Sequence, residues 1–254
     1  MVPAERRFFA ALITGWGVAA LLASQSVFIG AALALTVLLA LGALLALGSA
    51  RPELQWFGTV VSRSKHPNRI ALTIDDGPDP ATTPLFLEIL AKHGAHATFF
   101  LLTDRAAKYP ALVRQIADQG HEIGLHGLRH EAAIAWCSPR EGARWLREGL
   151  QGLQDLGVDA VPWFRPPFGV VSPRTFLAAA EAALGVAWCS IRTGDGVAVD
   201  VLRFRKRALA ARGGDVVLMH DGNATTIAEL PSILTAWTSA GFEITGFDRA
   251  QEAD

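Results

Sequence analysis

Residues 70–78 read Ile-Ala-Leu-Thr-Ile-Asp-Asp-Gly-Pro, an apolar run that ends in two adjacent carboxylates and a turn. A short apolar run bounded by a turn is typical of a buried strand. Thr83-Pro84 follows, with Thr as N-cap and Pro in the first turn, and predicts the start of a helix. This stretch therefore predicts a strand that delivers ionisable side chains to the loop before a helix.

The same alternation of short apolar runs and helical stretches continues along the chain. Ser138 and Ser172, each followed by Pro, mark two helix starts, and Ser138 forms a capping box with Glu141. Further strands are expected at residues 97–102, 121–125, 161–164, 186–191, 216–219 and 242–247. About seven such alternations predict a parallel sheet covered by helices, either an open doubly wound sheet or a closed barrel.

The N-terminal segment has a different character. From Phe8 to Ala50 there is no Asp, Glu, Lys or Arg. As one helix these 43 residues would reach roughly 65 Å, about twice the ~30 Å core of a bilayer. The polar Ser24-Gln25-Ser26 interrupts the run, so we expect a transmembrane hairpin with spans at about residues 8–23 and 27–48. A cleaved signal peptide is the alternative, although it leaves the second apolar run unexplained.

Basic residues flank both outer ends of this segment: Arg6 and Arg7 before it, and Arg51, Arg63, Lys65 and Arg69 after it. A hairpin places both flanks on one side, which the positive-inside rule makes the cytoplasm; an extracytoplasmic domain is the alternative. We therefore expect a multi-pass protein of the cell membrane. The predicted organisation is a membrane anchor (1–50), a linker (51–69), a catalytic domain (70–247) and a tail (248–254).

Charge is balanced outside the anchor. Residues 51–254 hold 21 Lys and Arg against 23 Asp and Glu, without a basic stripe, so a nucleic-acid partner is unsupported. Cys137 and Cys189 are the only cysteines, and their flanks lack metal-site spacing. We expect two unpaired, mostly buried thiols, with one disulfide as the alternative.

Ionisable residues follow the ends of five predicted strands: Asp75 and Asp76, His126, Arg165, Asp195, and His220 with Asp221. The carboxyl ends of parallel strands open on one face, so we expect a single site there. His126 and His130 are four residues apart and can both face one ion, and Asp76 can add a carboxylate. A set of two His and one carboxylate leaves coordination positions open and suits zinc or another borderline divalent metal.

Five short motifs, in this order, resemble those of the NodB-like polysaccharide deacetylases, carbohydrate esterase family four. They are Thr73-Ile74-Asp75-Asp76-Gly77-Pro78, His126-Gly127-Leu128-Arg129-His130, Arg165-Pro166-Pro167-Phe168-Gly169, the Asp195 region, and Leu218-Met219-His220-Asp221. The resemblance covers roughly residues 70–247 and implies a distorted seven-stranded (β/α) barrel, here preceded by the transmembrane hairpin. It implies metal-dependent hydrolysis of the N-acetyl group of an amino sugar in a polysaccharide or lipid-linked glycan.

The resemblance also implies a role for each site residue. Asp76, His126 and His130 would hold one divalent metal ion, with zinc expected. Asp75 would be the general base for the attacking water, and Arg165 would hold it in place and ionised.

On the leaving-group side, His220 would be the general acid that protonates the departing amine, with Asp195 holding it in the same way. The backbone N–H of Phe168 would help to stabilise the oxyanion, and Leu218 would line the pocket for the acetyl methyl. Amide hydrolysis needs such an acid because an amine anion cannot leave unprotonated.

Two positions depart from the family's pattern. Gly127 stands where Ser or Thr is usual, which loses a hydroxyl but no ligand. Gly196 stands where Trp is expected, which removes a wall of the acetyl pocket and leaves the acyl group and the glycan open. Beyond the ligand loop, Ile134 and Trp136 are expected to pack in the core rather than to contact a lipid.

Two further functions compete with deacetylation of a polymer. A domain on the cytoplasmic face cannot reach a finished wall polymer, so a deformylase of a lipid-linked amino sugar is the main alternative. A catalytically silent sugar-binding module is the alternative from a different class, but every residue needed for turnover is present. The expected partners are an amino-sugar glycan or lipid-linked sugar, and the membrane.

Overall fold

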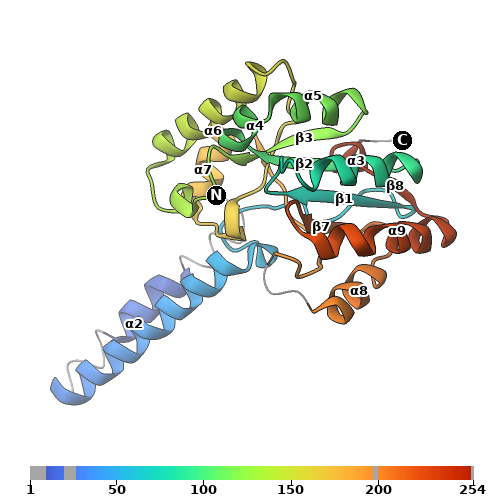
Figure 1. The fold of residues 1–254 in the computed structure, drawn as a ribbon. Helices are drawn as coiled ribbons and strands as arrows, with labels where there is room; N and C mark the ends of the chain where they lie inside the picture. Colours follow the sequence, from blue (N-terminus) through green and yellow to red (C-terminus); the bar gives the residue numbers. More distant parts are fainter. Residues whose placement is uncertain (1–9, 20–26, 197–199, 253–254) are drawn as a thin grey trace.

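Residues 10–19, 27–196 and 200–252 are described in the computed structural model (Figure 1). Parallel strands form one sheet in the order β5-β4-β3-β2-β1-β7-β6, with β8 paired to the start of β1. Their bounds are β1 (Arg69–Asp75), β2 (Thr98–Leu102), β3 (Glu122–Gly127), β4 (Trp163–Phe164), β5 (Gly185–Val186), β6 (Ile191–Arg192), β7 (Val216–His220) and β8 (Glu243–Thr245). The predicted parallel α/β sheet is confirmed as a half-barrel.

Helices surround the sheet, so the central strands are buried on both faces and read as apolar runs. The helices are α3 (Thr83–Lys92), α4 (Thr103–Lys108), α5 (Pro110–Asp118), α6 (Pro139–Gln154), α7 (Pro173–Glu181), α8 (Val201–Leu209) and α9 (Ala224–Ser239). The predicted capping box is confirmed: Ser138 Oγ accepts from Glu141 N, and the Glu141 carboxylate accepts from Ser138 N. Ser172 caps α7 in a similar way.

The strand predicted at residues 186–191 is wrong in its middle, and within the described residues the sheet has eight strands rather than seven. The chain there leaves one edge of the sheet and joins the other, so its backbone amides donate to carbonyl groups of three different segments. Ala187 N donates to Phe164 O at 2.9 Å, Trp188 N to Val61 O at 2.7 Å, and Ser190 N to Val216 O at 3.0 Å. β5 and β6 therefore lie at opposite edges and do not pair with each other, which leaves a half-barrel.

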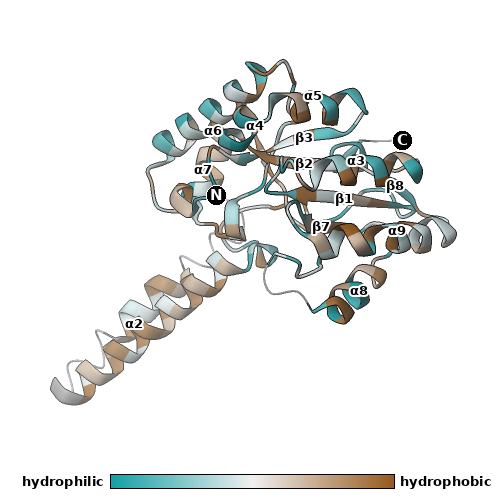
Figure 2. Cartoon of the chain, in the orientation of Figure 1, coloured by the Kyte–Doolittle hydropathy of each residue, from teal (hydrophilic) through white to brown (hydrophobic). Residues whose placement is uncertain are grey.

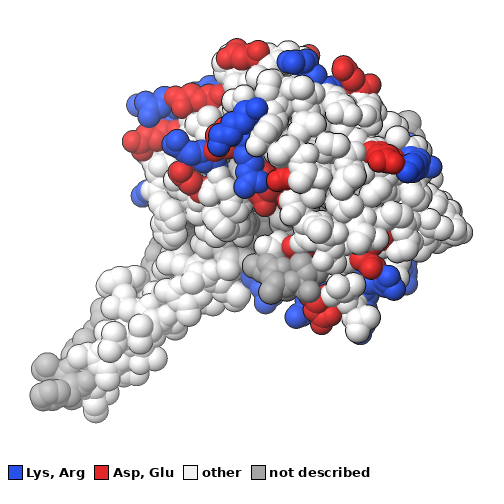
Figure 3. All heavy atoms as spheres, in the orientation of Figure 1, with Lys and Arg blue, Asp and Glu red and all other residues white. Residues whose placement is uncertain are grey.

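Helix α2 (Val27–Ala50) projects from the domain (Figures 1 and 2). Its stretch Ile29–Ala50 is long and apolar enough to cross a membrane, and the projecting part carries no charged side chain (Figure 3). A shorter apolar helix, Ala10–Ala19, lies beside it: a Cβ at Gly15 would lie 3.6 Å from Val37 Cγ1. The predicted Ser24-Gln25-Ser26 break lies outside the described residues, so one candidate span is supported and the two-span hairpin stays a prediction.

The end of α2 is fixed to the domain. Ser49 O accepts a hydrogen bond from Val171 N at 3.1 Å, just after the 3-10 helix η3 (Pro167–Gly169). The segment predicted as a linker continues along the domain through the 3-10 helix η1 (Pro52–Leu54), and Val61 forms a parallel bridge with Ala187. The foot of the apolar helix therefore lies next to a loop that carries one of the predicted motifs.

Candidate active site

A cavity of about 300 Å³ lies at the carboxyl ends of the strands. Eight of the nine predicted site residues line it: Asp75, Asp76, His126, His130, Arg165, Phe168, Leu218 and His220. The ninth, Asp195, lies behind His220 and is hydrogen-bonded to it. Trp188, Arg192 and Gly194 also line the cavity and were not predicted. The parallel sheet thus brings five distant segments to one place.

Asp76, His126 and His130 converge on one point. Asp76 Oδ1 lies 3.3 Å from Nε2 of each histidine. His126 extends from β3, and His130 lies on the bend that follows, with its ring 4.0 Å from that of Phe168. Nδ1 of His126 donates to Arg165 O at 2.8 Å, so its Nε2 presents a lone pair to the carboxylate.

The three side chains fit a divalent metal ion. One ligand atom from each lies within 4.8 Å of the others. Asp76 Oδ1 is buried and lacks a hydrogen bond of good geometry despite its two 3.3 Å contacts. Burial raises the pKa of Asp76, but its interactions with His126 and His130 outweigh burial and lower the pKa to about 2. A cation would satisfy an ionised oxygen and two imidazole lone pairs at once.

Asp75 is paired with a fully buried arginine. Arg165 Nη1 donates to Asp75 Oδ1 at 2.7 Å and to Thr73 Oγ1 at 2.7 Å. Nη2 donates to Trp188 O at 3.1 Å, and the guanidinium lies over the Phe100 ring at 4.2 Å. Arg165 is only 1% exposed, so its charge needs the Asp75 carboxylate beside it. The pair fixes one oxygen of Asp75.

His220 and Asp195 form a second charged pair of the site. His220 Nδ1 lies 2.8 Å from Asp195 Oδ1, and Asp195 Oδ2 accepts from His220 N and from Thr226 Oγ1. Thr193 Oγ1 donates to Asp195 Oδ1 at 2.8 Å. Burial lowers the pKa of His220, but the hydrogen bond and charge of Asp195 outweigh it, so the pKa lies above the ordinary value. This arrangement keeps a proton available on His220.

Backbone conformation singles out two of the predicted residues. Asp76 has φ +73° and Phe168 has φ +57°, a region that non-glycine residues seldom adopt. Phe168 is 61% exposed although its ring is large and apolar. Such conformations persist where surrounding structure imposes them, and they cluster at functional sites. Leu218, by contrast, is buried with a face on the cavity.

The two departures from the family's pattern have different surroundings. A Cβ at Gly127 would lie 2.4 Å from the Trp145 ring, and its φ of +125° also requires glycine. Trp145 on α6 therefore occupies the space that Ser or Thr would need. Gly196 lines the cavity, and a Cβ there would lie 3.0 to 3.3 Å from the His220 ring atoms. A larger side chain at Gly196 would therefore crowd the predicted acid.

The sequence did not reveal how Asp221 positions the loop after β1. Asp221 is buried, and its Oδ1 accepts from Thr82 Oγ1 at 2.5 Å. Its Oδ2 accepts from Thr83 Oγ1 and from Asp79 N. These bonds fasten the loop that follows Asp76 to the end of β7. Arg105 Nη1, which donates to Asp76 O at 2.8 Å, was missed in the same way.

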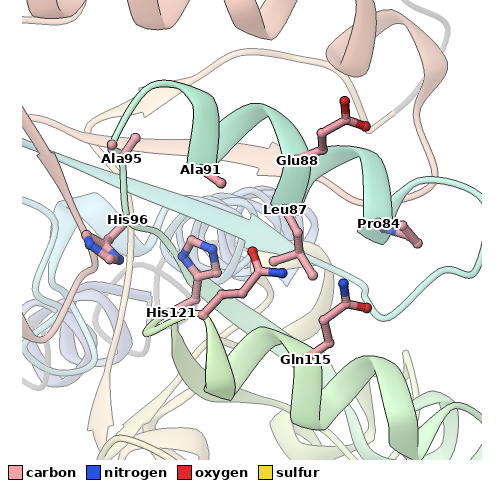
Figure 4. A pocket seen from close by; sticks show the side chains of 10 residues that line it. Pro84, Leu87, Glu88, Ala91, Ala95, His96, Gln115 and His121 are labelled. Carbon is pink, nitrogen blue, oxygen red and sulfur yellow. The ribbon is translucent and has the colours of Figure 1, made fainter.

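A larger cavity of about 620 Å³ lies between α3 and α5, away from this chemistry (Figure 4). His96, two residues before β2, and His121, directly before β3, line it, so the cavity lies at the amino end of the sheet. Burial is the main cause that lowers the pKa of His121 to about 4, and its Nδ1 accepts from Ala97 N. Within the described ranges no third ligand completes a metal site there.

Elsewhere, both cysteines are free, as expected, and burial raises the pKa of Cys189 to about 12. Ile134 is buried as predicted, but the core position predicted for Trp136 is wrong: its side chain is 71% exposed.

Comparisons with known proteins show that the chain is similar in sequence to polysaccharide deacetylases. The sequence model of a family described as polysaccharide deacetylase matches residues 62–187. Peptidoglycan-N-acetylglucosamine deacetylase PgdA of Listeria monocytogenes is 33% identical over 193 residues, covering 74% of this chain. The chain spans about two-fifths of that relative, since the match covers 40% of it. A peptidoglycan-N-acetylglucosamine deacetylase of Bacillus cereus is 33% identical over 204 residues, covering 76% of this chain and 92% of the relative.

A solved structure shows the same fold. It is described as a mutant, with restored enzymatic activity, of a pseudoenzyme of carbohydrate esterase family four; the wild-type protein is from Bacillus anthracis. The TM-score is 0.70 at 26% identity, over 76% of this chain and 71% of that chain. Similarity of fold therefore does not by itself distinguish an active enzyme of this family from a pseudoenzyme.

Proposed function

The chain belongs to the polysaccharide deacetylase family, and we propose that it is a membrane-anchored, metal-dependent N-deacylase of amino sugars. The reaction proposed is hydrolysis of the N-acetyl group of an amino sugar in a polysaccharide or lipid-linked glycan. One observation carries the proposal: a candidate metal triad, a buried Asp–Arg pair and an Asp–His pair meet at one cavity.

Asp76, His126 and His130 would hold one divalent ion, and their nitrogen and oxygen donors fit zinc. Bound there, such an ion supplies Lewis acidity, which polarises the amide carbonyl and lowers the pKa of water towards ~7. The ring hydrogen bond from His126 to Arg165 O fixes the tautomer that ligation requires.

Asp75 is the proposed general base. Arg165 engages its Oδ1, so Oδ2 is the oxygen proposed to take the proton from the attacking water. Arg165 is held in the core by its hydrogen bonds and its ring contact and cannot follow the substrate, so its proposed role is to position Asp75.

His220 is the proposed general acid. With Nδ1 held by Asp195, its Nε2 is the atom that gives a proton to the departing nitrogen. The backbone N–H of Phe168 is proposed to donate to the developing oxyanion, and Leu218 to contact the acyl methyl. Base and acid thus extend from the paired ends of neighbouring strands, Asp75 from β1 and His220 from β7, and both line one cavity.

A deformylase of a lipid-linked amino sugar is the second candidate. Gly196 leaves the acyl group open, since the pocket lacks the wall that a Trp side chain would supply. The position of α2 favours a lipid-linked sugar, because an apolar helix long enough to span a membrane ends beside the site.

The test of the proposed function is an assay of full-length protein, stripped with a chelator and reloaded with Zn²⁺, for acetate and formate released from N-acetyl and N-formyl amino-sugar substrates. We expect zinc-dependent release of an acid from at least one substrate. Fully zinc-loaded protein that binds these sugars without releasing either acid would instead support the silent sugar-binding module.

Replacement of Gly196 by Trp tests the acyl pocket. Because the position faces the His220 ring, we expect Gly196→Trp to reduce kcat/KM for bulky acyl groups by about tenfold more than for formyl, about the discrimination that a hydrophobic pocket gives per methylene. Metal content should not change. Equal effects on small and bulky acyl groups would show that the position does not select the acyl group.

The side of the membrane is tested by reporter fusions in a bacterial host. We propose two spans with the domain in the cytoplasm, from the basic residues at both outer ends of the apolar segment. A reporter active only outside the cytoplasm should work at position 25 and fail after residue 254. Activity after residue 254 would place the domain outside and favour a wall or surface polysaccharide as substrate.

A further inference from the structure

A third cavity, of about 570 Å³, shares a wall with the catalytic cavity. Arg192 and Gly194 line both. The other charged residues that line it are Arg51, Arg207 and Glu53, and we refer to it as the arginine cavity. Three guanidinium groups therefore face one carboxylate, and a guanidinium stays protonated at any physiological pH. The arginine cavity is a positively charged extension of the site.

These arginines lack carboxylate partners in the described ranges, and the one ring contact among them joins Arg192 to Trp188, with the guanidinium carbon 5.5 Å from the ring centroid. In the described part of the chain, no carboxylate forms an ion pair with Arg51, Arg192 or Arg207, whereas Arg205 of the same helix pairs with Glu229. A Cβ at Gly194 would lie 2.6 Å from Arg207 Nη1. The missing side chain at Gly194 thus admits the Arg207 guanidinium to the wall between the two cavities.

Both cavities lie at the foot of α2. Arg51 is the residue directly after the helix, and Ser49 O is bonded to Val171 N. Val171 is three residues from Phe168, which lines the catalytic cavity, so their Cα atoms are at most about 11 Å apart. The apolar stretch of α2 ends at Ala50. The polar surface of a membrane crossed by α2 would therefore lie beside both cavities.

Exposed aromatic rings mark the same side. Trp136 is 71% exposed and Phe168 is 61% exposed. Trp136 is held near the foot of α2, because Ser172 Oγ, next to Val171, donates to Ala135 O at 2.8 Å. Tryptophan is enriched at membrane–water interfaces. Trp136 therefore supports a site that opens at the membrane surface.

Resting on the proposed function, we infer that the arginine cavity binds the phosphate ester that joins the acylated amino sugar to a membrane lipid. With the acyl amide in the catalytic cavity, the phosphate lies past the wall formed by Arg192 and Gly194, and the lipid chain enters the bilayer beside α2. Arginine binds phosphate through paired, charge-assisted hydrogen bonds, whereas a neutral wall polymer offers no such group.

The test compares three substrates with full-length, zinc-loaded protein in phosphatidylcholine vesicles. The first is an N-acetylated amino sugar joined to an isoprenoid lipid by a phosphate, the second joins the same sugar and lipid by a neutral ether, and the third is the soluble sugar phosphate. We expect kcat/KM to be highest for the first.

Arg207→Gln should lower the ratio of kcat/KM for the first substrate to kcat/KM for the second by at least about tenfold, as loss of a charge-assisted hydrogen bond implies. Arg203→Gln, an exposed arginine of the same helix outside the cavity, is the matched control and should leave the ratio as in the wild type.

The outcomes separate the two proposals. Hydrolysis of both lipid-borne substrates with a ratio insensitive to Arg207→Gln would overturn the phosphate site and leave the N-deacylase intact. Use of the soluble sugar phosphate as efficiently as the lipid-borne one would overturn the lipid. Failure to hydrolyse any acylated amino sugar, including those of the acid-release assay, would overturn the N-deacylase itself.

Discussion

His126→Ala is expected to strip the metal ion and to reduce amide hydrolysis to the background rate. His126 is only 3% exposed, its Nδ1 is fixed by Arg165 O, and its Nε2 lies 3.3 Å from Asp76. The imidazole is therefore held in one orientation, in which Nε2 faces the other proposed ligands. Loss of an outer partner of a ligand typically costs 10- to 100-fold in metal affinity, so loss of a ligand should cost more than about 100-fold.

The measurement is metal per chain by elemental analysis after dialysis, together with the rate of acid release. His93→Ala is the matched control, because His93 caps α3 with its Nδ1 near Ile89 O and lies outside the site. The control should keep both metal and activity. Full metal occupancy in His126→Ala would remove His126 from the ligand set, and with it the two-His arrangement proposed here.

Much of the site could be predicted from sequence because parallel strands impose a simple rule. Each strand that ends in an ionisable residue delivers it to the same face, so Asp75, His126 and His220 could be placed together without coordinates. The rule operates through the backbone and needs no knowledge of side-chain packing. Each of these residues is in fact at the carboxyl end of its strand and lines one cavity.

Long-range side-chain bonds could not be predicted in that way. Asp221 bonds Thr82, 139 positions earlier, and no local pattern marks that pairing. The absence of a side chain at Gly127 is explained by Trp145, which reaches it from α6. Trp136 was predicted in the core because it is apolar, yet apolar character does not say which way a ring points in an irregular loop.

The strand predicted at residues 186–191 shows a limit of apolar runs as a signal. The run is buried almost throughout, which the apolar pattern predicted correctly, but burial here comes from crossing between the sheet edges. Trp188 illustrates why: its carbonyl accepts from Arg165 in the site, while its amide donates to Val61 O outside the named strands. An apolar pattern predicts which residues are buried, but it does not predict which carbonyl groups accept hydrogen bonds from their backbone amides.

Asp75→Asn and Asp76→Asn are expected to fail in different ways, although the residues are neighbours. Asp75→Asn should retain the metal and lose at least about 100-fold in kcat, which is typical of removing a general base. Asp76→Asn should lose the metal, because Asp76 supplies the one carboxylate among the three proposed ligands, beside two imidazoles. An amide oxygen carries no charge to bind the ion.

Stability has to be measured beside activity, since Arg165 is buried and Asp75 is the carboxylate bonded to it. Breaking a buried ion pair by neutralising one partner typically costs about 3–5 kcal/mol, so Asp75→Asn should also lower Tm. Asp79→Asn, in the same loop, is the matched control: its Oδ1 accepts from Ala81 N, and an Asn side chain can do the same.

Rates, metal content and Tm of the three variants, compared at a temperature where all are folded, distinguish the general base from the metal ligand. If Asp75→Asn lost its metal while Asp76→Asn kept it, the roles of the two carboxylates would be reversed, and the base would be the residue with positive φ.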